Sequence, residues 1–162
     1  MQISEPKIVT TEEISLIGYA RDMHLLNMQI PALWQEFRSH PLVRNKNVPT
    51  FYSVQRYHEP VDLKAFSPTA LFTKWATAPS EFFDTTPEGM EVLVVPGGLY
   101  AQFEVQAPPT AAKEVFGHIY GQWLPQSGYQ LAHRHQVEVI PHDYIQQGDN
   151  AKEIIWIPIA EM

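Results

Sequence analysis

The chain has 162 residues, of which 44% are hydrophobic and 18% charged, and this balance excludes an intrinsically disordered acidic chain. The length is typical of one domain, so we expect a single domain over residues 1–162. A net charge of −7 disfavours nucleic-acid binding and favours cationic partners. The absence of cysteine excludes disulfides, thiolate catalysis and cysteine-ligated metal centres.

Nothing in the sequence indicates a membrane or an exported protein. There is no run of about 18 apolar residues, so we expect no transmembrane helix. The first residues, MQISEPK, lack the basic segment and apolar stretch of a secretory signal. We therefore expect a cytoplasmic protein with no membrane partner.

The first half of the sequence predicts a strand, a helix and two further strands. Alternating residues within 7–20 indicate an extended segment. A helix should begin near Pro31 and end before Pro41, because proline is tolerated only in the first turn. Aromatic and β-branched residues then predict strands over 51–58 and 69–78. Four apolar residues recur with helical spacing in this half: Ile30, Leu33, Trp34 and Phe37.

The second half repeats this order of elements. Residues 91–105 are β-rich and are interrupted at 96–98, which predicts a hairpin turn or a bulge. A helix should begin at 108–110 and end at Pro125, and strands over 137–140 and 154–159 close the chain. The buried face of this helix is predicted to contain Ala112, Val115, Phe116, Ile119, Tyr120 and Trp123.

The two halves are also similar at a fixed offset. Gly18-Tyr19-Ala20 matches Leu99-Tyr100-Ala101 at a shift of 81, and Trp75 and Trp156 are separated by the same 81 residues. We predict an α+β fold of two duplicated β-α-β-β units related by a pseudo-two-fold axis. The mostly antiparallel sheet should carry both helices on one face and a ligand cleft on the other.

Glu138 is the main candidate for a binding residue. It stands between Val137 and Val139, and strand alternation places it on the opposite face from these valines. If the valines face the helices, Glu138 faces the cleft. A buried carboxylate is costly unless it is paired or protonated, and a bound organic cation would meet that cost. A solvent-facing edge position and an ordinary ion pair with an arginine are the alternatives.

Several aromatic residues are candidates for the same pocket. Trp156 faces away from the row formed by Ile155 and Ile157, so its ring could stack on a planar cation, although a structural role in the sheet is the alternative. Trp123 ends a helical stripe near the expected mouth of the pocket. Further candidates are Tyr100, Tyr57 and Trp75. By contrast, we expect the helical residues Trp34, Phe37, Phe116 and Ile119 to lie in the core.

The sequence offers no clear metal or catalytic motif. His133 and His135 lie on one side of an extended segment, with His142 nearby, but a metal site needs at least three protein ligands and a third is not evident. The sequence contains no Gly-x-Ser-x-Gly elbow, no phosphate-binding glycine-rich loop and no His-Glu-x-x-His. We therefore expect no metal and no cofactor.

Six motifs occur in a characteristic order along nearly the whole chain: IPALWQEF (30–37), EGME (88–91), PGGLYAQF (96–103), WLPQSGY (123–129), VEVI (137–140) and EIIWIPI (153–159). This order resembles the GyrI-like effector-binding domain, which senses ligands in several AraC-type and MerR-type transcription regulators and also occurs alone. The chain is similar in particular to the stand-alone members carried on integron cassettes.

This resemblance implies an aromatic pocket between the halves with a buried glutamate, at Glu138 here, that pairs with lipophilic cations. Because the domain starts near residue 5, we expect no preceding DNA-binding domain and no direct nucleic-acid binding. The function predicted is non-covalent binding of small lipophilic cations. Two alternatives stay open: a hydrolase that uses Glu138 as general base, and a protein–protein inhibitor of the gyrase-inhibitor type. A homodimer is also left open.

Overall fold

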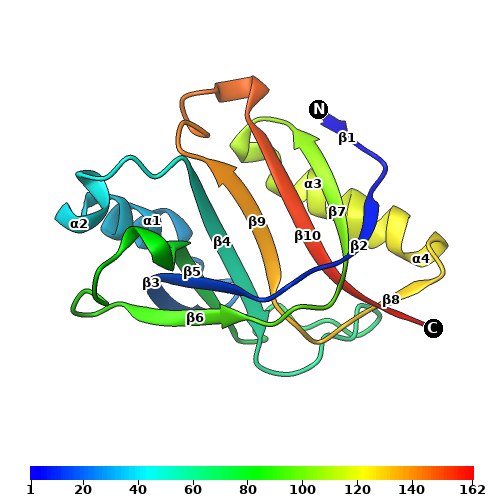
Figure 1. Cartoon of the computed structure of the whole chain (residues 1–162). Helices are drawn as coiled ribbons and strands as arrows, with labels where there is room; N and C mark the ends of the chain where they lie inside the picture. Colours follow the sequence, from blue (N-terminus) through cyan, green and yellow to red (C-terminus); the bar gives the residue numbers. More distant parts are fainter.

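In the computed structural model, which describes residues 1–162, ten strands join in one antiparallel sheet (Figure 1). The strands are β1 (Gln2–Ile3), β2 (Lys7–Thr10), β3 (Ile14–Met23), β4 (Thr50–Tyr57), β5 (Phe72–Pro79), β6 (Glu91–Val95), β7 (Leu99–Gln106), β8 (Tyr129–Leu131), β9 (Gln136–Pro141) and β10 (Lys152–Glu161). Their order is β1-β7-β10-β9-β4-β5-β3-β6, with β2 also beside β7 and β8 also beside β10. The predicted α+β class with a mostly antiparallel sheet is confirmed.

The two halves of the chain meet at the pairing of β4 with β9. Outward from this seam, the first half is ordered β4-β5-β3 and the second half β9-β10-β7. The same order therefore occurs on both sides. The pseudo-two-fold axis that would relate the halves in space stays a prediction.

The main helix of each half follows from local sequence. Helix α1 (Ile30–Ser39) has Pro31 in its first turn and stops before Pro41, which begins the short α2 (Pro41–Arg44). In the second half, α3 (Ala112–His118) continues through a π-helical turn (Ile119–Trp123) into α4 (Leu124–Gln126). This turn ends just before Pro125, which cannot donate a backbone hydrogen bond within a helix. Short 3₁₀ turns form at Ser80–Phe82, Pro109–Ala111 and Gly148–Asn150.

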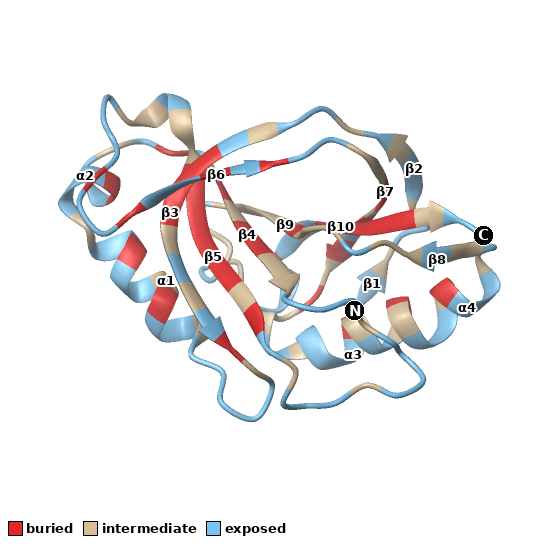
Figure 2. Ribbon diagram, turned by 90° about the horizontal axis from the view of Figure 1, so that it is seen from below, coloured by how far each residue is buried: buried red, intermediate tan, exposed pale blue.

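Helices α1 and α3 cover the same face of the sheet, one over each half (Figure 2). Leu33 and Phe37 of α1 pack against first-half strands, in a cluster that includes Phe51 and Ala76. The second-half cluster joins α3 and the π-helical turn to β7 and β10, and it includes Val115, Ile119, Phe103, Ile155 and Ile157. The register across the sheet places Ala76, Ser53, Glu138 and Ile155 in one row, so both helices lie on the side of this row.

The opposite face of the sheet is filled by a third cluster. Val54 of β4 and Val137 of β9 are both fully buried there, together with Leu16 and Trp75. Leu93 and Val95 of the edge strand β6 complete this cluster. The sheet thus has an apolar core on each face, and no helix is needed on this side.

The interruption at residues 96–98 is not the predicted hairpin. Strand β6 pairs with β3 of the first half, whereas β7 pairs with β10 and β2, so the segment carries the chain from one half to the other. Residues 96–98 cross the chain close to Thr11, whose N–H donates to the carbonyl of Gly98 at 2.8 Å. A Cβ on Gly97 would stand 2.4 Å from the Thr11 carbonyl oxygen, so glycine is required by this close crossing.

No helix in the chain is long and apolar enough to cross a membrane.

Gly18 is predicted to be indispensable for the central sheet. It is buried between Thr77 of β5 and Glu91 of β6, and a Cβ would lie 1.8 Å from the carbonyl oxygen of Ala76. Gly18→Ala should lower the free energy of unfolding by about 2 to 4 kcal/mol, because backbone cannot move aside cheaply. Urea denaturation followed by circular dichroism measures this change.

The matched control is Gly117→Ala in α3, where a Cβ would meet nothing within 4 Å. This exposed change should be neutral or stabilise by up to about 1 kcal/mol, since alanine is the better helix former. Equal effects of the two substitutions would contradict the packing described for Gly18.

Candidate functional site

A cavity of about 1410 Å³ lies between α1 and α3, on the helix-covered face of the sheet. Its walls come from these helices, and its floor comes from β4, β5, β9 and β10. The expectation of a cleft on the face without helices is not met, because that face is filled by the third core cluster. The two helices instead stand apart over their own halves, and the space between them is open above the seam.

The floor of the cavity is polar because of two neighbouring rows of the sheet. In one row, Lys74 of β5 is paired with Gln55 of β4, which is paired with Gln136 of β9. In the next row, Ser53 of β4 is paired with Glu138 of β9. Polar residues at alternate positions of the two seam strands therefore converge on one face, while Val54 and Val137 face the other core.

Glu138 and Lys74 form the only ion pair in this floor. The Lys74 Nζ lies 3.7 Å from Glu138 Oε1 and donates to Gln55 Oε1 at 3.5 Å. The lysine side chain is 4% exposed and the glutamate side chain 19% exposed. A buried lysine therefore partly neutralises a carboxylate that stays accessible from the cavity.

Glu153 of β10 supplies a second carboxyl group to the cavity. Its Oε2 accepts a hydrogen bond from the Tyr144 hydroxyl at 2.6 Å, whereas its Oε1 is buried without a partner. Burial, followed by the negative charge of Glu138, raises the pKa of Glu153 from 4.5 to about 8. Burial and Glu153 in turn raise the pKa of Tyr144. The floor thus holds one accessible carboxylate and one carboxyl group that keeps its proton near neutral pH.

The remaining lining of the cavity is largely apolar. Trp34 of α1 contacts Phe37 and Phe51 edge-on, and Phe116 stacks on Tyr120 along α3. The Tyr120 hydroxyl donates to Gln136, and burial raises the pKa of this tyrosine. Several lining residues are large, apolar and exposed, which is typical of a binding surface: Leu25, Met28, Leu63 and Ile145.

Two of the six candidate ligand-binding residues line this cavity, namely Glu138 and Tyr57. Tyr57 packs edge-on against Phe66 and Phe72, and burial raises its pKa. Trp123 is half-buried against Phe103, with ring centroids 5.1 Å apart, and lies outside the lining. A role in ligand binding stays a prediction for Glu138 and Tyr57.

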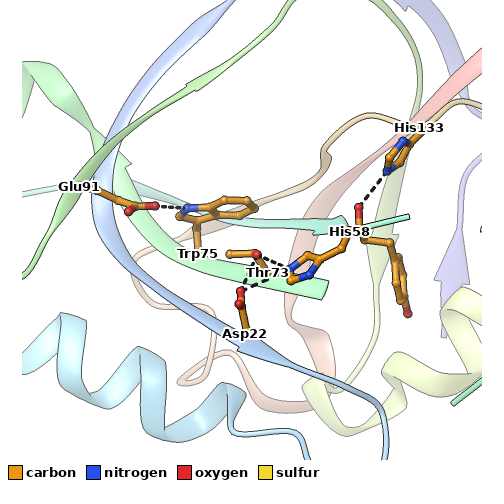
Figure 3. A network of polar contacts seen from close by, with 7 residues as sticks. Asp22, His58, Thr73, Trp75, Glu91 and His133 are labelled. Carbon is orange, nitrogen blue, oxygen red and sulfur yellow. Dashed lines mark hydrogen bonds and ion pairs between the residues drawn. The ribbon is translucent and has the colours of Figure 1, made fainter. Parts of the chain in front are cut away.

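The other three candidates, Trp156, Tyr100 and Trp75, lie on the opposite face of the sheet. The Trp156 and Tyr100 rings are 5.7 Å apart, and the Tyr100 hydroxyl donates to the His135 carbonyl at 2.7 Å. Trp75 donates from its Nε1 to Glu91 at 2.8 Å, as Figure 3 shows. The alternation that separated Trp156 from the isoleucine row was correct, but the isoleucines, and not the tryptophan, share the face of the cavity.

The histidines considered as metal ligands do not come together. His133 contacts the carbonyl of Tyr57 at 2.9 Å, also drawn in Figure 3, whereas the ring of His135 packs on Trp75. Burial, assisted by the charges of Arg56 and Arg134, lowers the pKa of His135 to about 4. No group of three histidine or acidic side chains in the chain could hold a metal ion.

Sequence patterns alone missed five residues of the site: Lys74, Glu153, Tyr144, Trp34 and Phe116. Trp34 and Phe116 were expected in the core and instead wall the cavity. The one available signal was a charged residue within a mainly apolar strand: Lys74 is the only charged residue of β5, and Glu153 precedes the apolar run of β10. Their convergence depends on strand pairing that local patterns do not reveal.

This fold is shared with solved structures of low sequence identity. An integron cassette protein from Vibrio cholerae aligns with a TM-score of 0.71 at 12% identity, over 98% of this chain and 97% of its own. SAV2435, solved bound to tetraphenylphosphonium, aligns with a TM-score of 0.69 at 12% identity, over 97% and 94%. EcmrR, solved in a complex with DNA, aligns with a TM-score of 0.64 at 15% identity, over 98% of this chain and 58% of its own.

The chain therefore has the same fold as these three proteins. Residues 7–159 match the family described as Cass2, integron-associated effector binding protein, and the chain belongs to this family. The resemblance inferred from the sequence motifs is confirmed. No curated protein matches the sequence.

The raised pKa of Glu153 predicts how stability depends on pH. Between about pH 4.5 and pH 8 the folded chain keeps a proton on Glu153 that the unfolded chain has released. This contribution to the free energy of unfolding is fully present below pH 4.5 and is lost as pH rises through 8. Glutamine has no proton to lose in this range, so the free energy of unfolding of Glu153→Gln should not fall in this way. The variant should therefore become more stable relative to the wild type as pH rises.

Urea denaturation at several pH values tests this prediction most cleanly between pH 6.5 and 8.5. Below that range His135 adds a slope of opposite sign, because its folded pKa of about 4 lies under its ordinary value of 6.5. The free energies of unfolding of the wild type and of Glu153→Gln should diverge steadily between pH 6.5 and 8. Parallel curves would show that Glu153 titrates like an exposed glutamate.

Proposed function

We propose that the protein binds small lipophilic organic cations non-covalently, and without catalysing a reaction, in the cavity between α1 and α3. The observation that carries the proposal is the accessible Glu138 carboxylate at the floor of a cavity whose walls are mainly aromatic and aliphatic. Such a pocket buries an apolar ligand and directs its charge to one point. Membership of an effector-binding family and the tetraphenylphosphonium bound to SAV2435 support this proposal.

Lys74 competes with a ligand cation for the Glu138 carboxylate. At 3.7 Å, its ammonium already provides a counter-charge in the free protein, so a ligand cation must share the carboxylate with it. Glu153 offers a second acceptor, because its partnerless Oε1 would become charged if an incoming cation lowered its pKa. The cavity can therefore increase its negative charge in response to a cation, at the cost of one proton released.

Aromatic walls make the proposed selectivity broad. Trp34, Phe116 and Tyr57 can contact aryl groups of many shapes, and a cation over an aromatic ring gains about 0.5 to 2 kcal/mol. Apolar burial and one charge discriminate weakly among ligands of similar size. We expect several unrelated lipophilic cations to bind with similar affinity.

Glu138→Gln tests the function directly, because it keeps the shape of the side chain and removes the charge. Binding of tetraphenylphosphonium should weaken by about 1 to 3 kcal/mol, because this cation has no hydrogen to donate and is attracted to the carboxylate by charge alone, across its aryl groups. Binding of neutral triphenylphosphine oxide should change little. Isothermal titration calorimetry measures both affinities, and the ligand recovered afterwards should be chemically unchanged.

The matched control is Glu114→Gln, which removes one negative charge from an exposed position of α3 outside the lining. It should leave both affinities unaltered. Equal losses for the cation and the neutral compound in Glu138→Gln would mean that Glu138 shapes the cavity without charging it. Unchanged affinity for both would place the binding site elsewhere.

A further inference from the structure

The residues around the cavity are mainly basic, although the protein as a whole is acidic. The chain carries a net charge of −7, yet the lining contains six basic residues and only two acidic ones, Glu138 and Glu153. Lys74 is paired with Glu138, and Arg134 donates to the carbonyl oxygens of Leu99 and Ile159. The other four basic residues are Arg38, Arg44, Lys46 and Lys113.

These four residues have no acidic partner. The ion pairs of the structure are Arg21–Glu36, His58–Asp22 and Lys74–Glu138, and none includes them. Arg38 is held by the ring of Phe51, 4.2 Å from its guanidinium carbon, and by the carbonyl oxygen of His142. The remaining three residues, Arg44, Lys46 and Lys113, form a basic rim. Their side chains make no hydrogen bond, so their charges are available to a ligand.

The basic rim borders both sides of the cavity. Arg44 ends α2, Lys46 follows it, and Lys113 lies in the first turn of α3. Arg44 and Lys113 are exposed, whereas Lys46 is half-buried. The carboxyl groups of Glu138 and Glu153, by contrast, project from the sheet that forms the floor. A molecule in the cavity therefore meets one accessible carboxylate, Glu138, at the floor and positive charge at its edges.

This separation of charge works against a simple cation. Charges at the rim act over roughly 8 Å at physiological ionic strength, and their repulsion would oppose part of the attraction of Glu138. A molecule with an anionic group beside its cationic centre would be attracted at both places. Like charges facing a ligand are a common way to reject the wrong one.

We propose that the preferred ligands of the cavity are lipophilic zwitterions, whose cationic centre meets Glu138 and whose anionic group meets the basic rim formed by Arg44, Lys46 and Lys113. The cationic half of this inference rests on the proposed function. The anionic half is independent of it and rests on the unpaired basic residues. Carboxylates and sulfonates attached to an apolar onium centre are the chemistry that fits.

The test uses two phosphonium compounds that differ in one charge, (4-carboxybutyl)triphenylphosphonium and its methyl ester. Both carry the same lipophilic cation, and only the first carries a carboxylate at neutral pH. Calorimetry on the wild type should show that the zwitterion binds at least about fivefold more tightly than the ester, as expected from one or two partly exposed charge contacts on one side of the cavity. This preference should shrink at high salt.

The variant Arg44→Gln/Lys46→Gln/Lys113→Gln should lose most of that preference and bind the ester as well as, or better than, the wild type. Its charge-matched control is Lys7→Gln/Lys64→Gln/Lys152→Gln, which removes three exposed basic residues outside the cavity. The control should keep the full preference. Circular dichroism melting confirms that each variant is folded.

The outcomes separate this inference from the proposed function. If the ester binds as tightly as the zwitterion to the wild type, the inference is overturned while cation binding stands. The same conclusion follows if the control loses the preference as much as the rim variant does. If neither compound binds, while both proteins are folded, the proposed function itself fails.

Discussion

The pairing of Glu138 with Lys74 at the floor of the cavity is the interaction on which the account depends. Both side chains lie beside the seam where the two halves of the chain join, and both face the space between α1 and α3. Burying charged groups costs several kcal/mol each unless partners and hydrogen bonds compensate. A buried charged pair that costs stability in this way is more often kept for function than for folding.

The location of the cavity follows from how each half buries its helix. Helix α1 packs mainly over β3 and β5, and α3 packs over β7 and β10. The seam strands β4 and β9 lie between the two helices, and α1 touches β4 at Phe51 near the start of that strand. The seam strands then differ on their two faces. Val54 and Val137 complete the core on one side, while Ser53, Gln55, Gln136 and Glu138 face the cavity on the other.

The sequence predicted the elements well because their signals are local. Proline positions and helical spacing placed α1 and α3, and aromatic and β-branched runs placed β4, β5, β9 and β10. The face of the sheet that carries the cavity could not be deduced in the same way. Alternation shows that Trp156 and Ile155 face opposite sides, but apolar residues fill both sides of this sheet, so the pattern does not distinguish them.

The site was only partly predictable for a related reason. Glu138 was evident because a carboxylate between two valines is unusual within one strand. Lys74 and Glu153 lie in other strands, and only the register of the pairing brings them to Glu138. Trp34 belongs to an amphipathic helix whose stripe is wider than the core it covers, so spacing alone could not separate its wall position from the core positions of Leu33 and Phe37.

Tryptophan fluorescence distinguishes a ligand on the helix-covered face of the sheet from one on the opposite face, because tryptophans lie on both faces. Trp34 is the only one of the four tryptophans that lines the cavity. A cation such as 1-dodecylpyridinium quenches indole fluorescence by contact, so it should quench the wild type and Trp156→Phe, and it should lose most of its effect on Trp34→Phe. Quenching that persists in Trp34→Phe and disappears in Trp156→Phe would contradict the account and place the ligand on the opposite face.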